Sequence, residues 1–357
     1  MRSPSTRILV AAAIAATLTL ALGGCSAAAP AAHADTTKPA TELRLGYFAN
    51  VTHGPALVGL AKGFFAKELG STKLTPQLFS AGPATIEALS AGAIDAAYIG
   101  PSPAINSYIK SGGQSAVIVA GAATGGAALV VRDGITRSSD LKGTTLATPQ
   151  LGNTQDVALR SWLAGKGYST SITGGGDVTI APTENADTLS LFASGKLDGA
   201  WLPEPWVSRL VIDGGAHVLV DEASLWKKGA FPTTVLLVNK SFLAEHPQTV
   251  TALLRANVES VDWLNTNPTE AAGVINGQIA RDSGKGLEDA VIERALKSVI
   301  FSDDPQAATY PTLLKHAVST GTAKNGSLDG LFDLGPVNGI LRVSGDATVS
   351  AHGLGSQ

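Results

Sequence analysis

The stretch "GAIDAAYIGPSP" (Gly92–Pro103) joins a short apolar strand pattern to an end made of glycine, prolines and one serine. Nearly the same pattern returns as "GKLDGAWLPEPW" (Gly195–Trp206). Strand ends made of small and polar residues leave room for a ligand, and in open parallel sheets ligands lie beyond the carboxyl ends of the strands. The repetition therefore predicts two similar lobes whose strand ends face each other.

Alternation of strand and helix patterns extends through both halves of the chain, which indicates βαβ units and mostly parallel sheets. The predicted strands cover 42–50, 73–80, 94–99, 144–149, 177–182 and 197–202. Two more strands, over 127–133 and 233–240, are expected to be the crossings between the lobes. After Lys240 the pattern is purely helical, with helix-start signals at Asn267-Pro268 and Asp304-Pro305.

These patterns predict an α/β fold with two lobes. The first lobe is discontinuous and comprises residues 42–131 plus 235–357, and the second comprises residues 132–234. The helical C-terminal tail is expected to fold back onto the first lobe. A cleft between two such lobes is a favoured position for a small-molecule site.

The N-terminus has the pattern of an export signal, with Arg2 and Arg7 around the start of an apolar segment over 8–22. The following "LGGC" (Leu22–Cys25) resembles the lipobox of bacterial lipoproteins, in which the cysteine is diacylated and becomes the new N-terminus. Cys25 is the only cysteine of the chain, so it has no internal disulfide partner. We expect a signal peptide at 1–24, a lipid anchor on Cys25 and a flexible tether at 25–41. An ordinary signal peptide with a chance cysteine is the alternative.

The composition excludes some partners. The chain of 357 residues is 44% hydrophobic and 15% charged, with a formal net charge of -3, which is typical of a folded globular protein. It contains no basic run and no interleaving of aromatic with basic residues. Nucleic acid is therefore not expected as a partner.

The predicted strand ends contain neutral donors rather than positive charges. Five segments lie at these ends, and none contains Lys or Arg: 47–55, 99–103, 121–127, 147–156 and 200–206. Four of them open a helix, and converging helix N-termini form an anion cradle through unpaired N–H groups and helix dipoles. Such a site suits a weakly basic monoanion such as a sulfonate or nitrate. A dianionic phosphate would more naturally be matched by a bidentate arginine.

Several residues of these segments have two interpretations. Trp201 is either a shelf for an alkyl chain or interlobe packing, and Glu204 either accepts from a ligand amine or hinge donor or caps the following helix. Asn153 or Thr154 is a ligand donor, a plain helix cap with Asp156 completing a capping box, or both at once.

Two further candidates remain. His53 is expected to be a polar rim residue rather than a catalyst. Ser102 is either a ligand donor or an ordinary turn residue.

Nothing in the sequence assembles a catalytic or metal site. The six histidines are scattered without an i,i+4 pair, and there is no G-x-S-x-G elbow. The glycines of 121–127 lack the Gly-Lys-Ser/Thr of a phosphate-binding loop. We therefore expect a binding protein with no cofactor, no metal and no catalytic residue.

Four motifs together resemble the aliphatic-sulfonate, taurine and nitrate substrate-binding proteins of ABC importers. They are "HGPALVGLAKGFFAKE", "SAGAIDAAYIGPSPAINSYIKSG", "ATPQLGNTQDVALRSWL" and "GKLDGAWLPEPW". The resemblance implies a two-lobed Venus-flytrap fold of the type II periplasmic binding proteins. It also implies capture of a small anion, an aliphatic sulfonate or taurine, outside the cytoplasmic membrane and its delivery to a permease and its ATPase. A monomer is expected.

The ligand site implied by the residues and motifs comprises Phe48, His53, Gly54, Pro55, Gly100, Ser102, Thr124, Gly125, Gln150, Gly152, Asn153, Thr154, Trp201 and Glu204. A nitrate-, bicarbonate- or thiamine-pyrimidine-precursor-binding protein of the same fold is the alternative. The related thiamine-pathway synthases have a cysteine-rich motif that is absent here. A sensory receptor would need a signalling module, and the chain shows none.

Overall fold

The structure, a computed structural model, describes residues 38–357. The predicted signal peptide, the predicted lipid site at Cys25 and most of the predicted tether therefore lie outside the described residues. Within 38–357, every helix is too short or too polar to span a bilayer.

A mixed eight-stranded sheet forms the first lobe, in the order β13-β12-β4-β10-β3-β1-β2, with β11 paired to β4. Its strands are β1 (Glu42–Tyr47), β2 (Lys73–Leu78), β3 (Ala96–Ile99), β4 (Ala116–Gly125), β10 (Pro232–Asn239), β11 (Val299–Phe301), β12 (Phe332–Asp333) and β13 (Gly355–Ser356). β1 is parallel to β2 and β3, whereas β10 is antiparallel to both β3 and β4. β1, β3 and β4 consequently end at the same edge of the sheet, where β10 begins.

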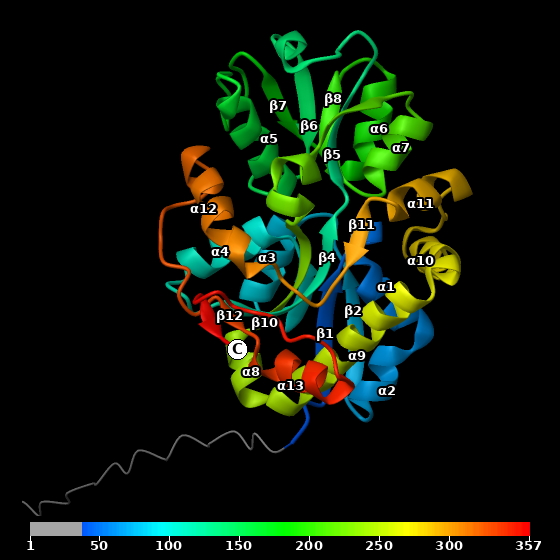
Figure 1. The fold of residues 1–357 in the computed structure, drawn as a ribbon, viewed down its shortest axis with the longest axis vertical. Coiled ribbons are helices and arrows are strands. Elements are labelled where there is room, and N and C mark those ends of the chain that lie inside the picture. Colours follow the sequence, from blue (N-terminus) through cyan, green and yellow to red (C-terminus); the bar gives the residue numbers. More distant parts are fainter. Residues whose placement is uncertain (1–37) are drawn as a thin grey trace, which may run out of the picture. The chain divides into compact units, whose positions relative to one another are not determined.

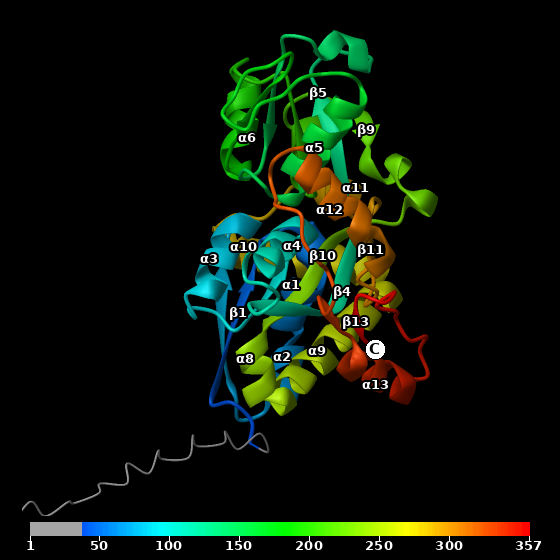
Figure 2. The same cartoon turned by 90° about the vertical axis from the view of Figure 1, so that its left-hand side faces the viewer.

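A five-stranded sheet forms the second lobe, in the order β7-β6-β8-β5-β9. Its strands are β5 (Ala127–Val131), β6 (Thr145–Thr148), β7 (Thr179–Pro182), β8 (Gly199–Pro203) and β9 (His217–Asp221). β6 is parallel to β7 and β8, and β5 is antiparallel to β8. Figures 1 and 2 show this lobe above the first one in both views.

The crossing from β4 to β5 depends on two glycines. Gly125 and Gly126 have φ angles of 75° and 69°, a conformation that L side chains rarely adopt. A Cβ on Gly125 would lie 2.6 Å from the carbonyl oxygen of Ser298, and one on Gly126 would lie 2.5 Å from Cγ2 of Val299. Strand β11, which contains Val299, therefore packs directly against this crossing.

Helices cover both sheets. In the second lobe these are α5 (Thr154–Gly165), α6 (Asn185–Ala193) and α7 (Trp206–Ile212). The others are α1 (Gly54–Lys62), α2 (Phe64–Leu69), α3 (Gly82–Ser90), α4 (Pro101–Lys110), α8 (Lys240–Glu245), α9 (Pro247–Thr266), α10 (Pro268–Ser283), α11 (Asp289–Leu296), α12 (Tyr310–Ser319) and α13 (Gly335–Ser344). α11 packs against α7, and α12 against α5, so the tail contacts the second lobe as well as the first.

Burial explains the apolar strand runs of the second lobe. Alternate residues of β5 point to opposite faces, so Val130 packs in one core cluster and Leu129 in another. Because both faces of this strand are covered, its residues do not need to alternate between apolar and polar. The predicted two-lobed α/β fold is confirmed, and the elements of 42–240 lie close to their predicted positions.

Two expectations differ from the structure. The prediction of a purely helical C-terminal tail is wrong, because β11, β12 and β13 complete the first sheet. Strands of two or three residues are too short to show a periodic pattern. In addition, residues 127–131, which lie within the predicted first lobe, form β5 of the five-stranded sheet.

Candidate ligand-binding site

A polar cavity lies between the two lobes, where the strand ends of the two sheets face each other. It is lined by Phe48, Asn50, Thr52, His53, Ser80, Gly100, Asn153, Gln155, Asn185, Pro203 and Thr233. The first six and Thr233 follow or begin strands of the first lobe, and the remaining four belong to the second. No Lys, Arg, Asp or Glu is among these lining residues. The cavity volume is about 20 Å³, which leaves room for about one water molecule.

Helix N-termini converge on this cavity. α1, α3, α4, α5 and α6 each begin at a lining residue or within two residues of one. The first N–H groups of a helix have no partner within it and, with the helix dipole, favour negative charge. The cavity is thus surrounded by donors without a formal positive charge.

His53 is a neutral donor in this cavity. Its ring stacks on Phe48 with a centroid distance of 4.3 Å, and its Nδ1 accepts the backbone N–H of Phe48 at 3.3 Å. Burial lowers the pKa of His53 to about 3. The neutral ring has one proton, and because Nδ1 accepts, that proton is on Nε2.

Second-lobe side chains cap first-lobe helices across the cavity. Asn153 Oδ1 accepts the N–H of Gly82, the first residue of α3, at 3.2 Å. Gln150 Oε1 accepts the N–H of Ala84 in the same helix turn at 3.3 Å. These bonds satisfy helix N–H groups that would otherwise be unpaired when the lobes meet.

A weaker bond of the same kind reaches α4. Thr154 Oγ1 accepts the N–H of Ser102 at 3.4 Å. The hydroxyl of Ser102 itself is buried without a partner, as is Oδ1 of Asn185. A ligand acceptor could satisfy the hydroxyl of Ser102, whereas Oδ1 of Asn185 needs a ligand donor.

The plain-cap interpretation of Asn153 is not what the structure shows. Asn153 occupies the N-cap position of α5 but makes no side-chain bond to that helix. The expected capping box is also not formed. Asp156 instead accepts the N–H of Gly152 at 2.9 Å and pairs with Arg160 at 3.0 Å.

Trp201 lies away from the cavity, and its proposed role as a ligand shelf is corrected. Its side chain is fully buried in a core cluster of the second lobe, and Nε1 donates to Oε2 of Glu222 at 2.7 Å. Its ring meets Trp162 edge to face. The sequence could not reveal which face of β8 the indole occupies, since both neighbours are apolar.

Glu204 also lies outside the cavity lining. Its Oε2 accepts the N–H of Ser208 in α7 at 3.0 Å, so it caps that helix. Its Oε1 accepts from Arg294 at 3.2 Å and from Ser298 at 3.3 Å, both in the C-terminal tail. Burial raises the pKa of Glu204 above its ordinary value. Glu204 therefore both caps α7 and accepts hydrogen bonds from donors outside the second lobe.

The remaining predicted residues surround the cavity or the crossing. Phe48, His53, Gly100 and Asn153 line the cavity. Thr124 bonds to the carbonyl of Phe231 beside the Gly125 crossing. Gly54 packs under Phe301, where a Cβ would lie 2.4 Å from the ring. The last two are Pro55 at the start of α1 and Gly152 in the turn before α5.

Sequence reasoning missed seven lining residues. Asn50, Thr52, Gln155 and Pro203 lie inside the segments that were considered but were not selected. Ser80, Asn185 and Thr233 lie outside those segments, after β2, after β7 and at the start of β10. The signal that could have identified Ser80 and Asn185 was the same strand-to-helix turn.

A larger cavity of about 320 Å³ adjoins the polar one. Its residues Ala49 and Ala186 are chain neighbours of the polar lining, and Pro205 is two residues after Pro203. Trp206 belongs to it and donates from Nε1 to Oδ1 of Asn50 at 2.9 Å. The other lining residues combine apolar and charged side chains: Arg209, Asp213, Ile279, Ser283, Lys285, Gly286, Leu287, Glu288 and Val291.

The residues of 38–357 show no grouping of three His, Cys, Asp or Glu side chains that could hold a metal ion.

Two lobes joined by crossings, with a donor-lined cavity between facing strand ends, define a solute-binding protein. The alkanesulfonate-binding protein SsuA from Xanthomonas axonopodis pv. citri, solved with bound MOPS, has the same fold. The TM-score is 0.68 at 21% identity, covering 81% of this chain and 96% of that chain. The predicted periplasmic-binding-protein fold is confirmed.

The chain belongs to the NMT1-like family, whose model matches residues 36–277. The taurine-binding periplasmic protein of Escherichia coli K12 is 28% identical over 217 residues, which are 60% of this chain and 64% of that protein. A Bacillus subtilis 168 protein named for aliphatic sulfonate binding is 28% identical over 292 residues, 77% of this chain and 80% of that protein. Both relatives are named for the solute that they bind, which confirms the prediction of a binding protein.

Proposed function

We propose that the protein captures a small organic anion, an aliphatic sulfonate or taurine, between its lobes and delivers it to the permease and ATPase of an ABC importer. The observation that supports this most directly is the interlobe cavity, which is lined by polar and apolar residues without formal charge. A sulfonate is a weak base and is satisfied by neutral donors.

The number of donors fits the affinity that capture requires. Micromolar binding needs about 8 kcal/mol. Hydrogen bonds to a charged group contribute roughly 1.5–3 kcal/mol each. Four such bonds, from Nε2 of His53, the hydroxyl of Ser102, the amide NH2 group of Asn185 and a helix N-terminus, would reach that value without a lysine or arginine.

Ligand entry requires the lobes to separate. A cavity of about 20 Å³ has no room for a sulfonate group. Separation would break the bonds from Asn153 to Gly82 and from Gln150 to Ala84. The anion then competes with these amide oxygens for the same N–H groups, and closure around it restores contacts from both lobes.

The adjoining cavity accounts for the organic part of the ligand. It offers apolar surface at Ala49, Leu287 and Val291, with carboxylates of Asp213 and Glu288 and the cations of Arg209 and Lys285 beside it. An alkyl or aminoalkyl tail that leaves the polar cavity past Asn50 would lie there. This favours a sulfonate with a tail over a bare inorganic anion.

A nitrate or bicarbonate carrier is the second candidate, and one observation favours it: the polar cavity is small. Proteins of this fold include a nitrate-binding protein, and relatives include a bicarbonate-binding protein. A pyrimidine precursor fits less well, since Phe48 is the only aromatic carbocycle in the lining and its ring is stacked on His53.

Calorimetric titration of the purified protein with taurine, 1-butanesulfonate, nitrate and bicarbonate tests the proposal. We expect the sulfonates to bind at least tenfold more tightly than nitrate or bicarbonate. The reverse order would support the second candidate, and binding of none of the four would refute the anion site.

Location outside the cytoplasmic membrane and lipidation at Cys25 belong to the same proposal. Metabolic labelling with a fatty acid, lost in Cys25→Ser, tests the anchor.

A further inference from the structure

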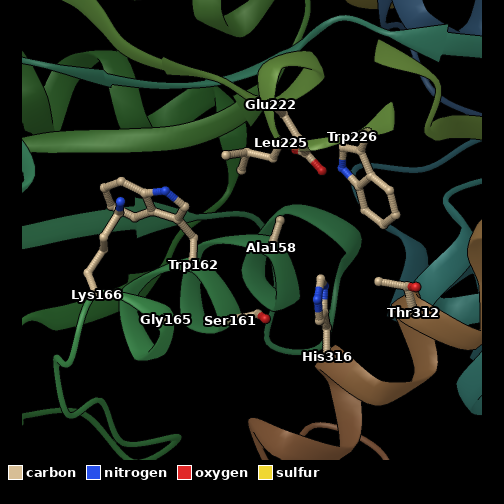
Figure 3. A pocket seen from close by; sticks show the side chains of 10 residues that line it. All are labelled: Ala158, Ser161, Trp162, Gly165, Lys166, Glu222, Leu225, Trp226, Thr312 and His316. Carbon is tan, nitrogen blue, oxygen red and sulfur yellow. The ribbon is translucent and has the colours of Figure 1, made fainter. Parts of the chain in front are cut away.

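A third cavity lies between the lobes and shares no lining residue with the two described above (Figure 3). Its volume is about 380 Å³, which is within the usual size of small-molecule sites. α5 of the second lobe forms one wall and α12 of the C-terminal tail another. The lining comprises Ala158, Ser161, Trp162, Gly165, Lys166, Glu222, Leu225, Trp226, Thr312 and His316.

Glu222 brings a buried carboxylate to this cavity without a countercharge. It begins the 3₁₀ helix Glu222–Leu225, in the segment that returns from β9 to β10, and is 1% exposed. Its neighbours are indole groups: Trp201 donates to Oε2 at 2.7 Å, and the Trp226 indole lies beside the carboxylate. Figure 3 shows the carboxylate next to the Trp226 indole, facing the cavity.

The charges around Glu222 leave its negative charge uncompensated. Burial, together with the nearby charge of Asp221, raises the pKa of Glu222 to about 7. His316 on α12 adds no positive charge at neutral pH, because burial and Lys315 lower its pKa. Lys166, directly after α5, is exposed and lies over the Trp162 ring, 5.7 Å from its centroid. A buried carboxylate without a cation is costly, and a bound cation would remove that cost.

The walls suit an organic cation. Trp162 and Trp226 line the cavity with indole rings, whose faces attract ammonium groups. Lys166, which also lines the cavity, already makes such a contact with Trp162. Leu225 and Ala158 add apolar surface for the carbon atoms attached to an ammonium nitrogen.

We infer that this cavity is a second ligand site, which binds a small organic ammonium ion with its charged head at Glu222 and its body between Trp162 and Trp226. The competing role of Glu222 is that of a buried acceptor for the indole N–H group of Trp201 and nothing more. Because α5 and α12 come from opposite sides of the lobe interface, the cavity changes shape when the lobes move. If the proposed sulfonate binding is correct, ammonium and sulfonate affinities are coupled, by the same factor in both directions.

Choline and its neutral carbon isostere 3,3-dimethylbutan-1-ol separate charge from apolar fit. Calorimetry on the purified protein at pH 8, without any sulfonate, should show saturable one-site binding of choline, with the isostere at least tenfold weaker. Equal affinities would show a purely apolar cavity and would overturn the inference, as would no choline binding. This comparison needs no variant and does not depend on the anion site.

The variant Glu222→Gln tests whether choline binds at Glu222. It keeps a carbonyl acceptor for the Trp201 indole but removes the charge, and we expect choline affinity to fall at least tenfold. Glu87→Gln, at an exposed position of α3, is the matched control and should bind choline as the unmodified protein does. Unchanged choline affinity in a folded Glu222→Gln protein would overturn the inference. In the unmodified protein, affinity should fall about tenfold for each pH unit below 7, as Glu222 becomes protonated.

Discussion

The side-chain oxygen of Asn153, in the second lobe, accepts the first N–H group of α3, from Gly82 in the first lobe, at 3.2 Å. A residue at the N-cap position of one helix thus caps a different helix across the interlobe cavity. The same N–H groups are the donors that an anion would use, so closure without a ligand and closure around one employ a common set of atoms.

Removal of the side-chain donors of Asn153 and Thr154 should weaken ligand binding. The double variant Asn153→Ala, Thr154→Ala removes an amide NH2 group that lines the cavity and a hydroxyl beside it. A hydrogen bond to a charged group contributes roughly 1.5–3 kcal/mol, so we expect at least a tenfold loss of sulfonate affinity by calorimetry, even though the competing caps on Gly82 and Ser102 are lost as well. Asn325→Ala, at an exposed loop position, is the control. A double variant that melts at the same temperature as Asn325→Ala is folded, so its loss of affinity is a loss of binding. An unchanged affinity in the double variant would contradict the proposed site.

Burial of His53 should make stability fall in acid. The unfolded chain takes up a proton near the ordinary pKa of 6.5, whereas folded His53 resists protonation down to about pH 3. Its contribution is therefore complete above pH 6.5 and is lost as pH falls toward 3. At pH 5 this amounts to about 2 kcal/mol. Urea unfolding at pH 7 and pH 5 should show a correspondingly smaller acid loss in His53→Gln. Equal losses in both proteins would contradict the assignment.

The crossing at Gly126 should tolerate no side chain. In Gly126→Ala the new Cβ would lie 2.5 Å from Cγ2 of Val299, in addition to the strain of a positive φ. Gly143→Ala is a matched control, because Gly143 also has a positive φ but no atom within 4 Å of its added Cβ. We expect thermal unfolding at a lower temperature in Gly126→Ala than in Gly143→Ala, together with weaker sulfonate binding. Similar behaviour of the two variants would mean that strand β11 does not constrain the crossing.

Glu204→Gln should affect taurine and a plain alkanesulfonate equally. From the sequence alone, a role of Glu204 in taurine recognition is as well supported as a role in capping, because the ammonium group of taurine would pair with a carboxylate. The structure places Glu204 against Arg294 and Ser298 instead, outside the polar cavity. Calorimetry with both ligands distinguishes the two roles: a selective loss for taurine would return Glu204 to the ligand site.

The sequence predicts this fold well where the determining signals are local. Strand-to-helix turns such as Ile99–Pro103 combine an apolar run, a proline and a helix pattern within a few residues, and these elements are where they were expected. The tail strands β12 and β13, with two residues each, have no such signal. They form because β4 offers an open edge, which is a property of the assembled sheet.

For the site, the sequence identifies the region but not the direction of each side chain. Asn153 and His53 were found because they open helices after strands. Trp201 lies at an equally suitable strand end, yet its side chain points into the core. Thr233 lines the cavity because β10 runs antiparallel and brings its first residues to the edge where the other strands end. That placement depends on strand order, which no local pattern encodes.

Helices α11 and α12 lie on either side of the base of the second lobe (Figure 1) and contact α7 and α5, respectively. A lobe joined to its neighbour by two crossings alone would be free to twist as well as to bend. The tail contacts the second lobe on both flanks, so a twist of that lobe about the crossings would have to break the α11–α7 or the α12–α5 contact. The last part of the chain therefore adds a cost to twisting that the two crossings alone would not impose.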